Sequence, residues 1–289
     1  MMRIAYLGPE GTVSHEATEC FFAGQSTSFI PYPSIADVFH ATVQGDTDLS
    51  VIPIENTIDG SVNPHLDFLV HENDLPIQAE WVYPSVQHLI GHPNPDGDGI
   101  EHVRRIVSIP VAIAQCRDFL KRELPHAQYE HVASTAEGVR TVQRMQTADL
   151  AAIGTQLAAD RYGLHVLAHN ITDHHNNFTR FILVGGQAFS HPSAGQAKST
   201  ILVTLPEDYP GALHQVLSAF AWRRINLSKI ESRPTKKKLG SYYFYIDIEE
   251  SMDSVLLPAA LQEVEAIGCQ VRILGSYQSY SYESVNSEV

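Results

Sequence analysis

The sequence predicts an α/β protein in which a two-lobed α/β domain precedes a smaller ferredoxin-like unit. Two observations carry this prediction. Short apolar segments alternate with segments of helical periodicity through the first part of the chain, as in domains with largely parallel sheets. After residue 199 the expected order changes to βαββαβ, which is the ferredoxin-like arrangement of four antiparallel strands covered on one side by two helices.

The first domain begins with a short buried strand, and a turn marked by glycine and proline leads from it into a helix near Val13. Two series of alternating elements are separated by a loop-forming segment rich in proline, aspartate and glycine. We expect strands at 3–8, 28–32 and 49–54, helices at 35–44 and 63–70, the loop at 92–99, strands near 105–108, 128–133 and 151–154, and helices at 111–124, 135–145 and 155–162.

We expect the chain to cross from one lobe to the other and to return, because the segment NNFTRFILVG is typical of one more strand of the first lobe. A crossing and a return create a cleft between lobes, which is a usual place for a small ligand. The expected bounds are 1–185 for this domain, with lobe one at about 1–76 and 163–185 and lobe two at about 77–162, then a linker at 186–199, a second domain at 200–279 and a polar tail at 280–289.

The second domain shows the periodicity of its fold directly. Ile201, Val203 and Leu205 alternate as a strand, and a helix with one apolar face follows over 213–220. Two strands at 225–234 and 241–249, a helix at 257–264 and a last strand at 270–278 complete the unit.

Composition excludes several classes of protein. The 289 residues carry 19 basic and 33 acidic side chains, and this formal charge of −14 argues against nucleic acid as a partner. No apolar run approaches the roughly 18 residues of a membrane span, and the first residues do not resemble a signal peptide. The three cysteines have no metal or redox spacing, so we expect a soluble protein of the reducing cytoplasm, without a membrane partner.

The histidines do not predict a metal site. His174 and His175 follow Asp173, and His65 precedes His71 by six residues, but neither set has the spacing that zinc sites favour. The run of lysines at 236–238 is explained by a solvated hairpin loop.

Small polar residues gather where four strands are expected to end. Helix capping and ligand binding both explain such residues, and for any single segment capping is the more common role. Thr179 and Arg180 are neighbours on an expected strand and therefore point to opposite faces, so that only one of them faces a cleft directly. The segments are GPEGTVS at 8–14, PIENT at 53–57 with Gly60 and Ser61, STA at 134–136, and NNFTRF at 176–181.

Taken together, these segments resemble the prephenate dehydratase family, whose members combine a catalytic domain built like a periplasmic solute-binding protein with a C-terminal ACT regulatory domain. The resemblance rests on GPEGTVSHEA, PIENTIDGSV, STAEG, AAIGTQLAADRYGL and NNFTRF, then on PGAL at 210–213 and ESRP at 231–234. The chain departs from the pattern where many members have Ser-His-Pro-Gln, because it has Ile109 and Val111 around Pro110. No chorismate mutase segment precedes residue 1, which favours the monofunctional form.

The resemblance implies a hydro-lyase that removes CO2 and water from prephenate to give phenylpyruvate in phenylalanine biosynthesis. No electron-sink cofactor is required, because the driving force is formation of the aromatic ring, and we expect no cofactor. Thr179 is then the hydrogen-bond donor to the departing hydroxyl, while Glu55 is an alternative acid or a structural carboxylate. The resemblance implies substrate contacts by Gly11, Thr12, Asn56, Ser108, Gln115 and Thr135, and a supporting or carboxylate-binding role for Arg180.

The resemblance also implies that the ACT domain binds L-phenylalanine as an effector at an interface between two subunits, so we expect a homodimer or homotetramer. The residues that it assigns to this site are Gly211, Ala212, Leu213, Glu231, Ser232 and Arg233. Three alternatives stay open at this point: an arogenate dehydratase, a solute-binding module without catalysis, and a catalytically silent amino-acid sensor.

Overall fold

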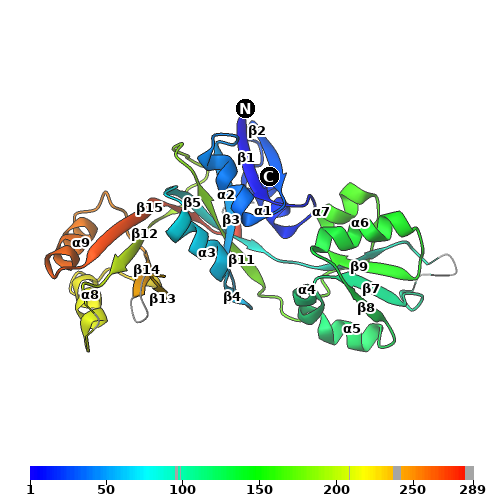
Figure 1. Ribbon diagram of the computed structural model, residues 1–289. Coiled ribbons are helices and arrows are strands. Elements are labelled where there is room, and N and C mark those ends of the chain that lie inside the picture. The colour runs from blue at the N-terminus through cyan, green and yellow to red at the C-terminus, as the bar shows by residue number, and fades with distance from the viewer. Residues whose placement is uncertain (95–96, 98, 208, 237–241, 284–289) are drawn as a thin grey trace. The chain divides into compact units, whose positions relative to one another are not determined.

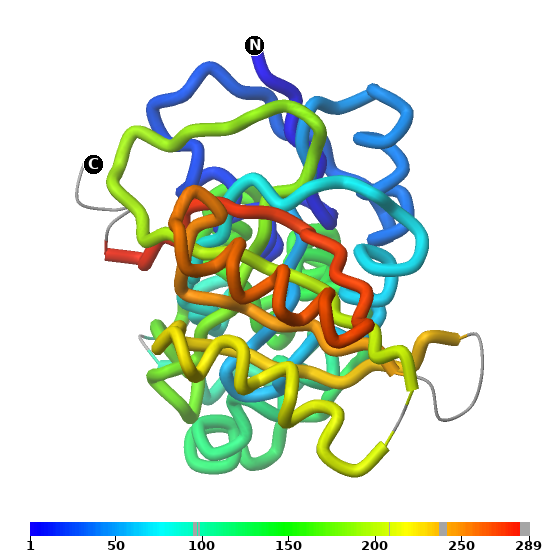
Figure 2. The backbone as a smooth tube through the Cα atoms, turned by 90° about the vertical axis from the view of Figure 1, so that its left-hand side faces the viewer, coloured from blue at the N-terminus to red at the C-terminus, as the bar shows by residue number. Residues whose placement is uncertain are grey.

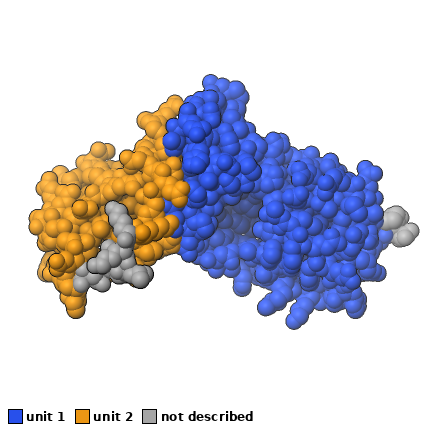
Figure 3. All heavy atoms as spheres, in the orientation of Figure 1, with its two compact units in different colours: residues 1–68, 82–181, 289 blue, residues 69–81, 182–288 orange. Residues whose placement is uncertain are grey.

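The computed structural model describes residues 1–94, 97, 99–207, 209–236 and 242–283. The chain forms two compact units (Figure 3). Unit 1 comprises Met1–Phe68 and Val82–Phe181, and unit 2 comprises Leu69–Trp81 and the described residues from Ile182 onward. No helix in these described ranges is both long enough and apolar enough to cross a membrane.

The first lobe of unit 1 is built on the parallel strands β1, β2 and β3 (Figure 1), of which β1 and β3 have buried apolar centres. Ile4, Ala5 and Tyr6 of the central strand are fully buried, as the expected hydrophobic run requires. Strand β1 pairs with β2 on one side and β3 on the other, and β11 lies beside β3. The elements are β1 (Met2–Leu7), α1 (Val13–Phe21), β2 (Thr27–Tyr32), α2 (Ile35–Val43), β3 (Leu49–Asn56), β4 (Gly60–Ser61), α3 (Asn63–Asp67) and β11 (Phe178–Val184), whose last three residues belong to unit 2.

The second lobe of unit 1 has its own five-stranded sheet, in the order β10-β6-β9-β7-β8. The sheet is mixed rather than largely parallel, because β7 pairs in parallel with β8 and β9, whereas β6 pairs antiparallel with β9 and β10. The elements are β6 (His88–Gly91), β7 (Arg105–Ser108), α4 (Pro110–Gln115), α5 (Arg117–Glu123), β8 (Gln128–His131), α6 (Thr135–Met145), β9 (Leu150–Gly154), α7 (Gln156–Tyr162) and β10 (His165–Ala168).

The single helix expected at 111–124 is wrong, because the segment forms two helices that meet at Cys116. The backbone of Cys116 leaves the helical region, with φ −115° and ψ 15°. The carboxylate of Asp173 then accepts hydrogen bonds from the backbone N–H groups of Asp118 and Phe119 at 3.1–3.3 Å. A remote side chain therefore caps the second helix, in the position that a local residue usually occupies.

Unit 2 contains the expected ferredoxin-like arrangement, with neighbouring strands β13-β14-β12-β15 all antiparallel. Helices α8 and α9 lie side by side over these strands (Figure 2) and share one apolar core with them. The elements are η1 (Phe68–Glu72), a π-helical turn whose first residue belongs to unit 1, then β5 (Ile77–Pro84), whose last three residues belong to unit 1, and β12 (Gln196–Thr204), α8 (Ala212–Ala221), β13 (Leu227–Pro234), β14 (Tyr242–Ile248), α9 (Leu256–Ala266) and β15 (Gln270–Tyr280).

The two-lobed α/β domain and the ferredoxin-like unit that follows it are confirmed, but the sequence did not predict strands β4, β5, β6 and β10, and β10 pairs in the sheet of the second lobe. Strand β12 begins at Gln196, inside the segment expected to be a linker, and its early residues pair with the end of β15. Strand β15 also pairs in parallel with β5. The expected lysine loop lies partly outside the described residues, as does most of the expected tail.

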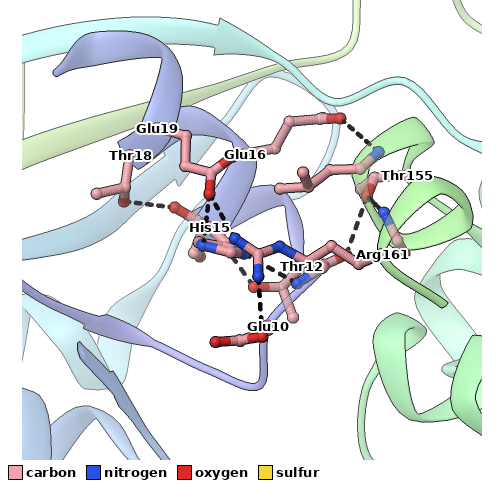
Figure 4. Close-up of polar contacts among 12 residues, drawn as sticks. Glu10, Thr12, His15, Glu16, Thr18, Glu19, Thr155 and Arg161 are labelled. Atoms are coloured by element: carbon pink, nitrogen blue, oxygen red, sulfur yellow. Dashed lines mark hydrogen bonds and ion pairs between the residues drawn. The ribbon is translucent and has the colours of Figure 1, made fainter. Parts of the chain in front are cut away.

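The two lobes of unit 1 are joined by polar contacts around α1 (Figure 4). Arg161 of α7 forms ion pairs with Glu10 and Glu19, and Thr155 donates a hydrogen bond to the carbonyl of Gly11 at 2.9 Å. His15 is buried beneath them, 1% exposed, and stacks on Tyr6. These contacts fix the turn before α1 against the second lobe.

A buried ionic cluster joins four strands of unit 2. Lys198 of β12 donates to both oxygens of Glu80 of β5, at 2.8 and 3.1 Å, and lies 3.7 Å from a carboxylate oxygen of Asp247 of β14. The hydroxyls of Tyr277 and Ser279 of β15 also donate to Glu80. The side chains of Glu80 and Asp247 are 3% and 0% exposed, so Lys198 neutralises carboxylates that water does not reach.

Replacing Lys198 therefore removes a cation that contacts both buried carboxylates. We expect Lys198→Met to lower the free energy of unfolding by about 3–5 kcal/mol, as for other buried ion pairs that lose one partner. Urea denaturation followed by circular dichroism measures this change. Lys121→Met, at an exposed position of α5, is the matched control and should change stability by less than about 0.5 kcal/mol. Equal stability of the two variants would contradict the prediction.

His15 is expected to make the stability of the protein sensitive to acid. Burial, more than the nearby Arg161, lowers the pKa of His15, and its ring accepts a hydrogen bond from the N–H of Gly11 at 3.1 Å. The unfolded chain takes up a proton on this residue near pH 6.5, before the folded protein does, so the free energy of unfolding falls as the pH drops below that value.

The comparison of wild type with His15→Gln isolates this contribution. Glutamine can accept the same hydrogen bond but does not titrate. We expect the thermal midpoint of the variant to fall less between pH 7 and pH 5 than that of the wild type. His65 and His88, whose pKa values burial also lowers, remain in both proteins. Parallel curves for the two proteins would count against this role of His15.

Candidate functional site

A cavity of about 420 Å³ lies between the two lobes of unit 1, and Figure 3 shows a recess in the surface of this unit. Three helices begin at its wall, namely α1, α4 and α6. The N–H groups of a first helical turn have no partner within the helix and favour negative charge. Among the described residues that line the cavity, Asp59 is the only one with an ionisable side chain. The cavity is thus a site of neutral donors rather than of cations.

The side chain of Asn56, the last residue of β3, is fixed in orientation by the backbone. Its oxygen accepts hydrogen bonds from the N–H groups of Ile58 and Asp59, at 2.9 and 3.1 Å. The other end of the amide must therefore be the NH2 group. That group donates to Asn177 Oδ1 at 2.8 Å and to Thr179 Oγ1 at 3.1 Å.

The hydrogen bonds continue from Asn177 into the second lobe. Asn177 donates to the side-chain oxygen of Gln115 in α4 at 3.1 Å, and Gln115 donates to the carboxylate of Asp59 at 2.9 Å. Each amide in this series has one acceptor and one donor end, so the orientation of Asn56 sets that of the next two. Asn56, Asn177, Gln115 and Asp59 form a closed polar network, which we call the amide network.

Thr179, whose hydroxyl accepts a hydrogen bond from Asn56 of the amide network, also lines the cavity. It lies near the start of β11, beside the end of β3, where backbone bonds hold the two segments together. Thr57 N–H donates to the carbonyl of Phe178 at 2.9 Å, and Phe178 N–H donates to the hydroxyl of Thr57 at 2.9 Å. A second hydroxyl, that of Ser85, lies 2.7 Å from Thr179 Oγ1.

Five of the residues expected to contact a substrate line the cavity. They are Thr12, Asn56, Gln115, Thr135 and Thr179. Thr12 and Ser134 also cap helices, because their hydroxyls accept from the N–H groups of His15 and Glu137. Thr12 therefore both caps α1 and lines the cavity. At α6 the neighbouring residue Ser134 is the cap, and Thr135 is the first residue of the helix.

Three of the expected contacts do not line the cavity. Ser108 is fully buried, and its hydroxyl donates to the carbonyl of Ile153 at 3.0 Å. Arg180 points away from Thr179 along the strand and forms an ion pair with Glu55 at 3.0 Å. Gly11 packs against α7, where a Cβ atom would lie 2.9 Å from the Cβ of Ala158, and its φ of +86° also favours glycine.

Sequence reasoning missed several polar residues of the site, among them Gln87, which lines the cavity. Ser85, Asp59 and Asn177 all take part in it, although Asn177 belongs to a segment that the sequence singled out. Ile109 and Val111, which stand where the family pattern has other residues, both lie at the cavity wall. No group of three or more histidine, cysteine, aspartate or glutamate side chains in the described part of the chain is arranged to hold a metal ion.

The residues expected to bind an effector divide between the two faces of the unit 2 sheet. Glu231 and Arg233 of β13 pair with Tyr245 and Tyr243 of β14. These side chains lie on the same face of the sheet as Asp247, which is the face away from the helices. Ser232 lies opposite Phe244, which packs on the core beneath α8 and α9. The turn at Gly211, with φ +92°, opens α8, so Gly211, Ala212, Leu213 and Ser232 share the side of the sheet that the helices cover.

Comparison with known proteins agrees with this architecture. A family model described as prephenate dehydratase matches residues 4–188, and one described as ACT domain matches residues 199–268. A prephenate dehydratase of Bacillus subtilis (strain 168) is 43% identical over 286 residues, which cover 96% of this chain and 99% of that protein.

Two solved structures are similar over nearly the whole chain. A prephenate dehydratase of Arthrobacter aurescens in complex with L-Phe has a TM-score of 0.83 at 35% identity and covers 96% of this chain and 89% of its own. GqqA, described as a novel type of quorum quenching acylase, has a TM-score of 0.83 at 26% identity and covers 96% of this chain and 98% of its own. The family models and the relative from Bacillus subtilis show that this chain belongs to the prephenate dehydratase family and carries its ACT domain at the C-terminal side.

Proposed function

We propose that the chain converts prephenate into phenylpyruvate, CO2 and water for the biosynthesis of phenylalanine, and that the reaction takes place in the cavity of unit 1. The observation that carries this proposal is that Thr179 lines the cavity and that its hydroxyl is held by the amide of Asn56. In this proposal residues 1–185 form the catalytic domain and residues 200–279 form the regulatory ACT domain.

The chemistry requires little from the protein beyond binding and a well-placed donor. Loss of CO2 leaves the electron pair of the broken carbon–carbon bond in the ring, and the hydroxyl on the opposite ring carbon departs as hydroxide, which takes up a proton from solvent to become water. The aromatic ring that forms supplies the driving force. Because no electron sink is needed, neutral donors aimed at the departing oxygen are sufficient to assist the reaction.

Thr179 suits the role of donor to the departing hydroxyl better than that of a full acid. A threonine hydroxyl has a pKa far above the near-neutral values of efficient general acids, so we propose strong hydrogen-bond donation. Glu55, the alternative acid, is already paired with Arg180 and does not line the cavity. We propose that Arg180 and Glu55 support the strands that carry Thr179 and Asn56.

The two carboxylates of prephenate are expected to meet helix N-termini. Thr12 and Thr135 lie at the starts of α1 and α6, where N–H groups and the helix dipoles favour anions. Gln115 and Asn56 provide further polar contacts in this proposal. Gly11 and Ser108 then act indirectly, by shaping the turn before α1 and the end of β7.

The decisive test is turnover of prephenate by wild type and by two variants of Thr179. We expect Thr179→Ala to lower kcat by about 10²–10³-fold, as does removal of one preorganised donor in other enzymes. Thr179→Ser keeps the hydroxyl and should retain activity within about tenfold of wild type. Phenylpyruvate is measured near neutral pH against a blank without enzyme, because prephenate decomposes in acid.

Thr141→Ala is the matched control for this experiment. Thr141 lies on α6, and its hydroxyl donates to the carbonyl of Glu137 within the helix, away from the cavity. It should leave turnover unchanged. A Thr179→Ser variant as inactive as Thr179→Ala would overturn the donor role. Wild type without activity on prephenate would overturn the proposed reaction and direct the same assay to arogenate, then to the sensor and solute-binding alternatives.

We propose that L-phenylalanine binds the ACT domain at the start of α8. Gly211 has no side chain to cap this helix, so the first-turn N–H groups can receive the carboxylate of an amino acid. Ser232 lies on the same side of the sheet as α8. The complex of the Arthrobacter aurescens protein with L-Phe supports this ligand. In this proposal two ACT domains complete the site, so the functional unit is a homodimer or homotetramer.

A single glycine tests the effector site. We expect Gly211→Ala to raise the phenylalanine concentration for half-maximal effect on turnover about tenfold, because a side chain at φ +92° strains the turn that positions the N–H groups. Gly268→Ala imposes similar strain at φ +94°, after α9, and should leave that concentration unchanged. Equal effects of the two substitutions would contradict the assignment.

A further inference from the structure

Ser85 is buried next to the proposed catalytic threonine. It follows the last residue of β5, is 6% exposed, and lines the same cavity as Thr179. Its backbone N–H donates to the carbonyl of Asn177 at 2.8 Å, which fixes the chain at this point. Its hydroxyl oxygen lies 2.7 Å from Thr179 Oγ1, the usual distance for a hydrogen bond between two hydroxyls.

The direction of this hydrogen bond decides where the proton of Thr179 points. A hydroxyl has one proton to donate and two positions at which it accepts. The NH2 group of Asn56 occupies one accepting position of Thr179, since the other end of that amide is held by the N–H groups of Ile58 and Asp59. If Thr179 donated to Ser85, no proton would remain for a ligand in the cavity.

We infer that Ser85 is a positioning residue, whose hydroxyl donates to Thr179 when substrate is bound; this inference rests on the proposed role of Thr179 as donor. Thr179 then accepts two hydrogen bonds, from Asn56 and from Ser85, and its single proton is left for the departing hydroxyl of the substrate. Ser85 does not touch the reacting atoms in this arrangement.

The two hydrogen bonds into Thr179 also make it a stronger donor. Each donor polarises the Thr179 oxygen that accepts its hydrogen bond, and hydrogen bonds in series strengthen one another in a low-dielectric site. This gain is largest when negative charge grows on the departing oxygen, so Ser85 should act on the transition state more than on substrate binding. The expected signature is a change in kcat without a comparable change in KM.

The first test is Ser85→Ala. We expect kcat for prephenate to fall about tenfold and KM to stay within about twofold, since one hydrogen bond is lost and no substrate contact is removed. Ser50→Ala is the matched control, because Ser50 is also buried and its hydroxyl also bonds to a threonine, Thr42, far from the cavity. The control should keep the kcat of wild type.

The second test separates the hydroxyl from side-chain volume. Ser85→Thr and Ser85→Val add the same bulk and differ in the hydroxyl alone, so any strain is common to both. We expect the threonine variant to exceed the valine variant about tenfold in kcat. Equal kcat values for this pair, or wild-type kcat in Ser85→Ala, would overturn the inference.

These outcomes are distinguishable from failure of the proposed function. If wild type turns over prephenate and Thr179→Ala does not, the reaction and its donor stand, and the Ser85 variants then decide the positioning role alone. If wild type fails to turn over prephenate, or Thr179→Ala is as active as wild type, the proposed function falls and the inference falls with it.

Discussion

The geometry of the cavity depends on one constraint, the orientation of the Asn56 amide. Two backbone N–H groups just beyond β3 hold its oxygen, so its NH2 group can point only toward Asn177 and Thr179. Through Asn177 the same orientation reaches Gln115 in the second lobe. A turn of the amide would place an oxygen against Thr179 and Asn177 and would leave several polar groups without partners, which is costly in a partly buried site.

Sequence reasoning found those parts of the site that stand in polar segments of recognisable pattern, and missed those that depend on remote contacts. Asn56 stands in such a segment at the end of β3, where an α/β sheet collects its ligands, and Thr179 stands in one at the start of β11. Ser85 stands in no such segment and is 94 residues from Thr179 along the chain. The break at Cys116 was missed for the same reason, because the cap of α5 is Asp173, 55 residues from Asp118.

The direction of individual side chains was the least predictable feature. The resemblance made Ser108 and Arg180 contacts, but each side chain points away from the cavity, into a backbone carbonyl and an ion pair respectively. Alternation along a strand predicted that Thr179 and Arg180 would face opposite ways, yet it could not say which of them faced the cleft. The neighbouring strand β3 determines the orientation. The amide of Asn56 bonds to Thr179 on one face, and the carboxylate of Glu55 pairs with Arg180 on the other.

Strand β5 carries Glu80 of the buried ionic cluster, and Ser85, which bonds to Thr179, directly follows its last residue. Glu80, on its unit 2 part, is bound by Lys198 and by two hydroxyls of β15. Ser85, directly after its end in unit 1, is bound through its backbone to Asn177 and through its hydroxyl to Thr179. A slip of one residue would turn every side chain of the strand to the opposite face, so neither group of partners could be kept. The register of β5 is therefore fixed from both ends, by buried charge at one and by hydroxyl and backbone hydrogen bonds at the other.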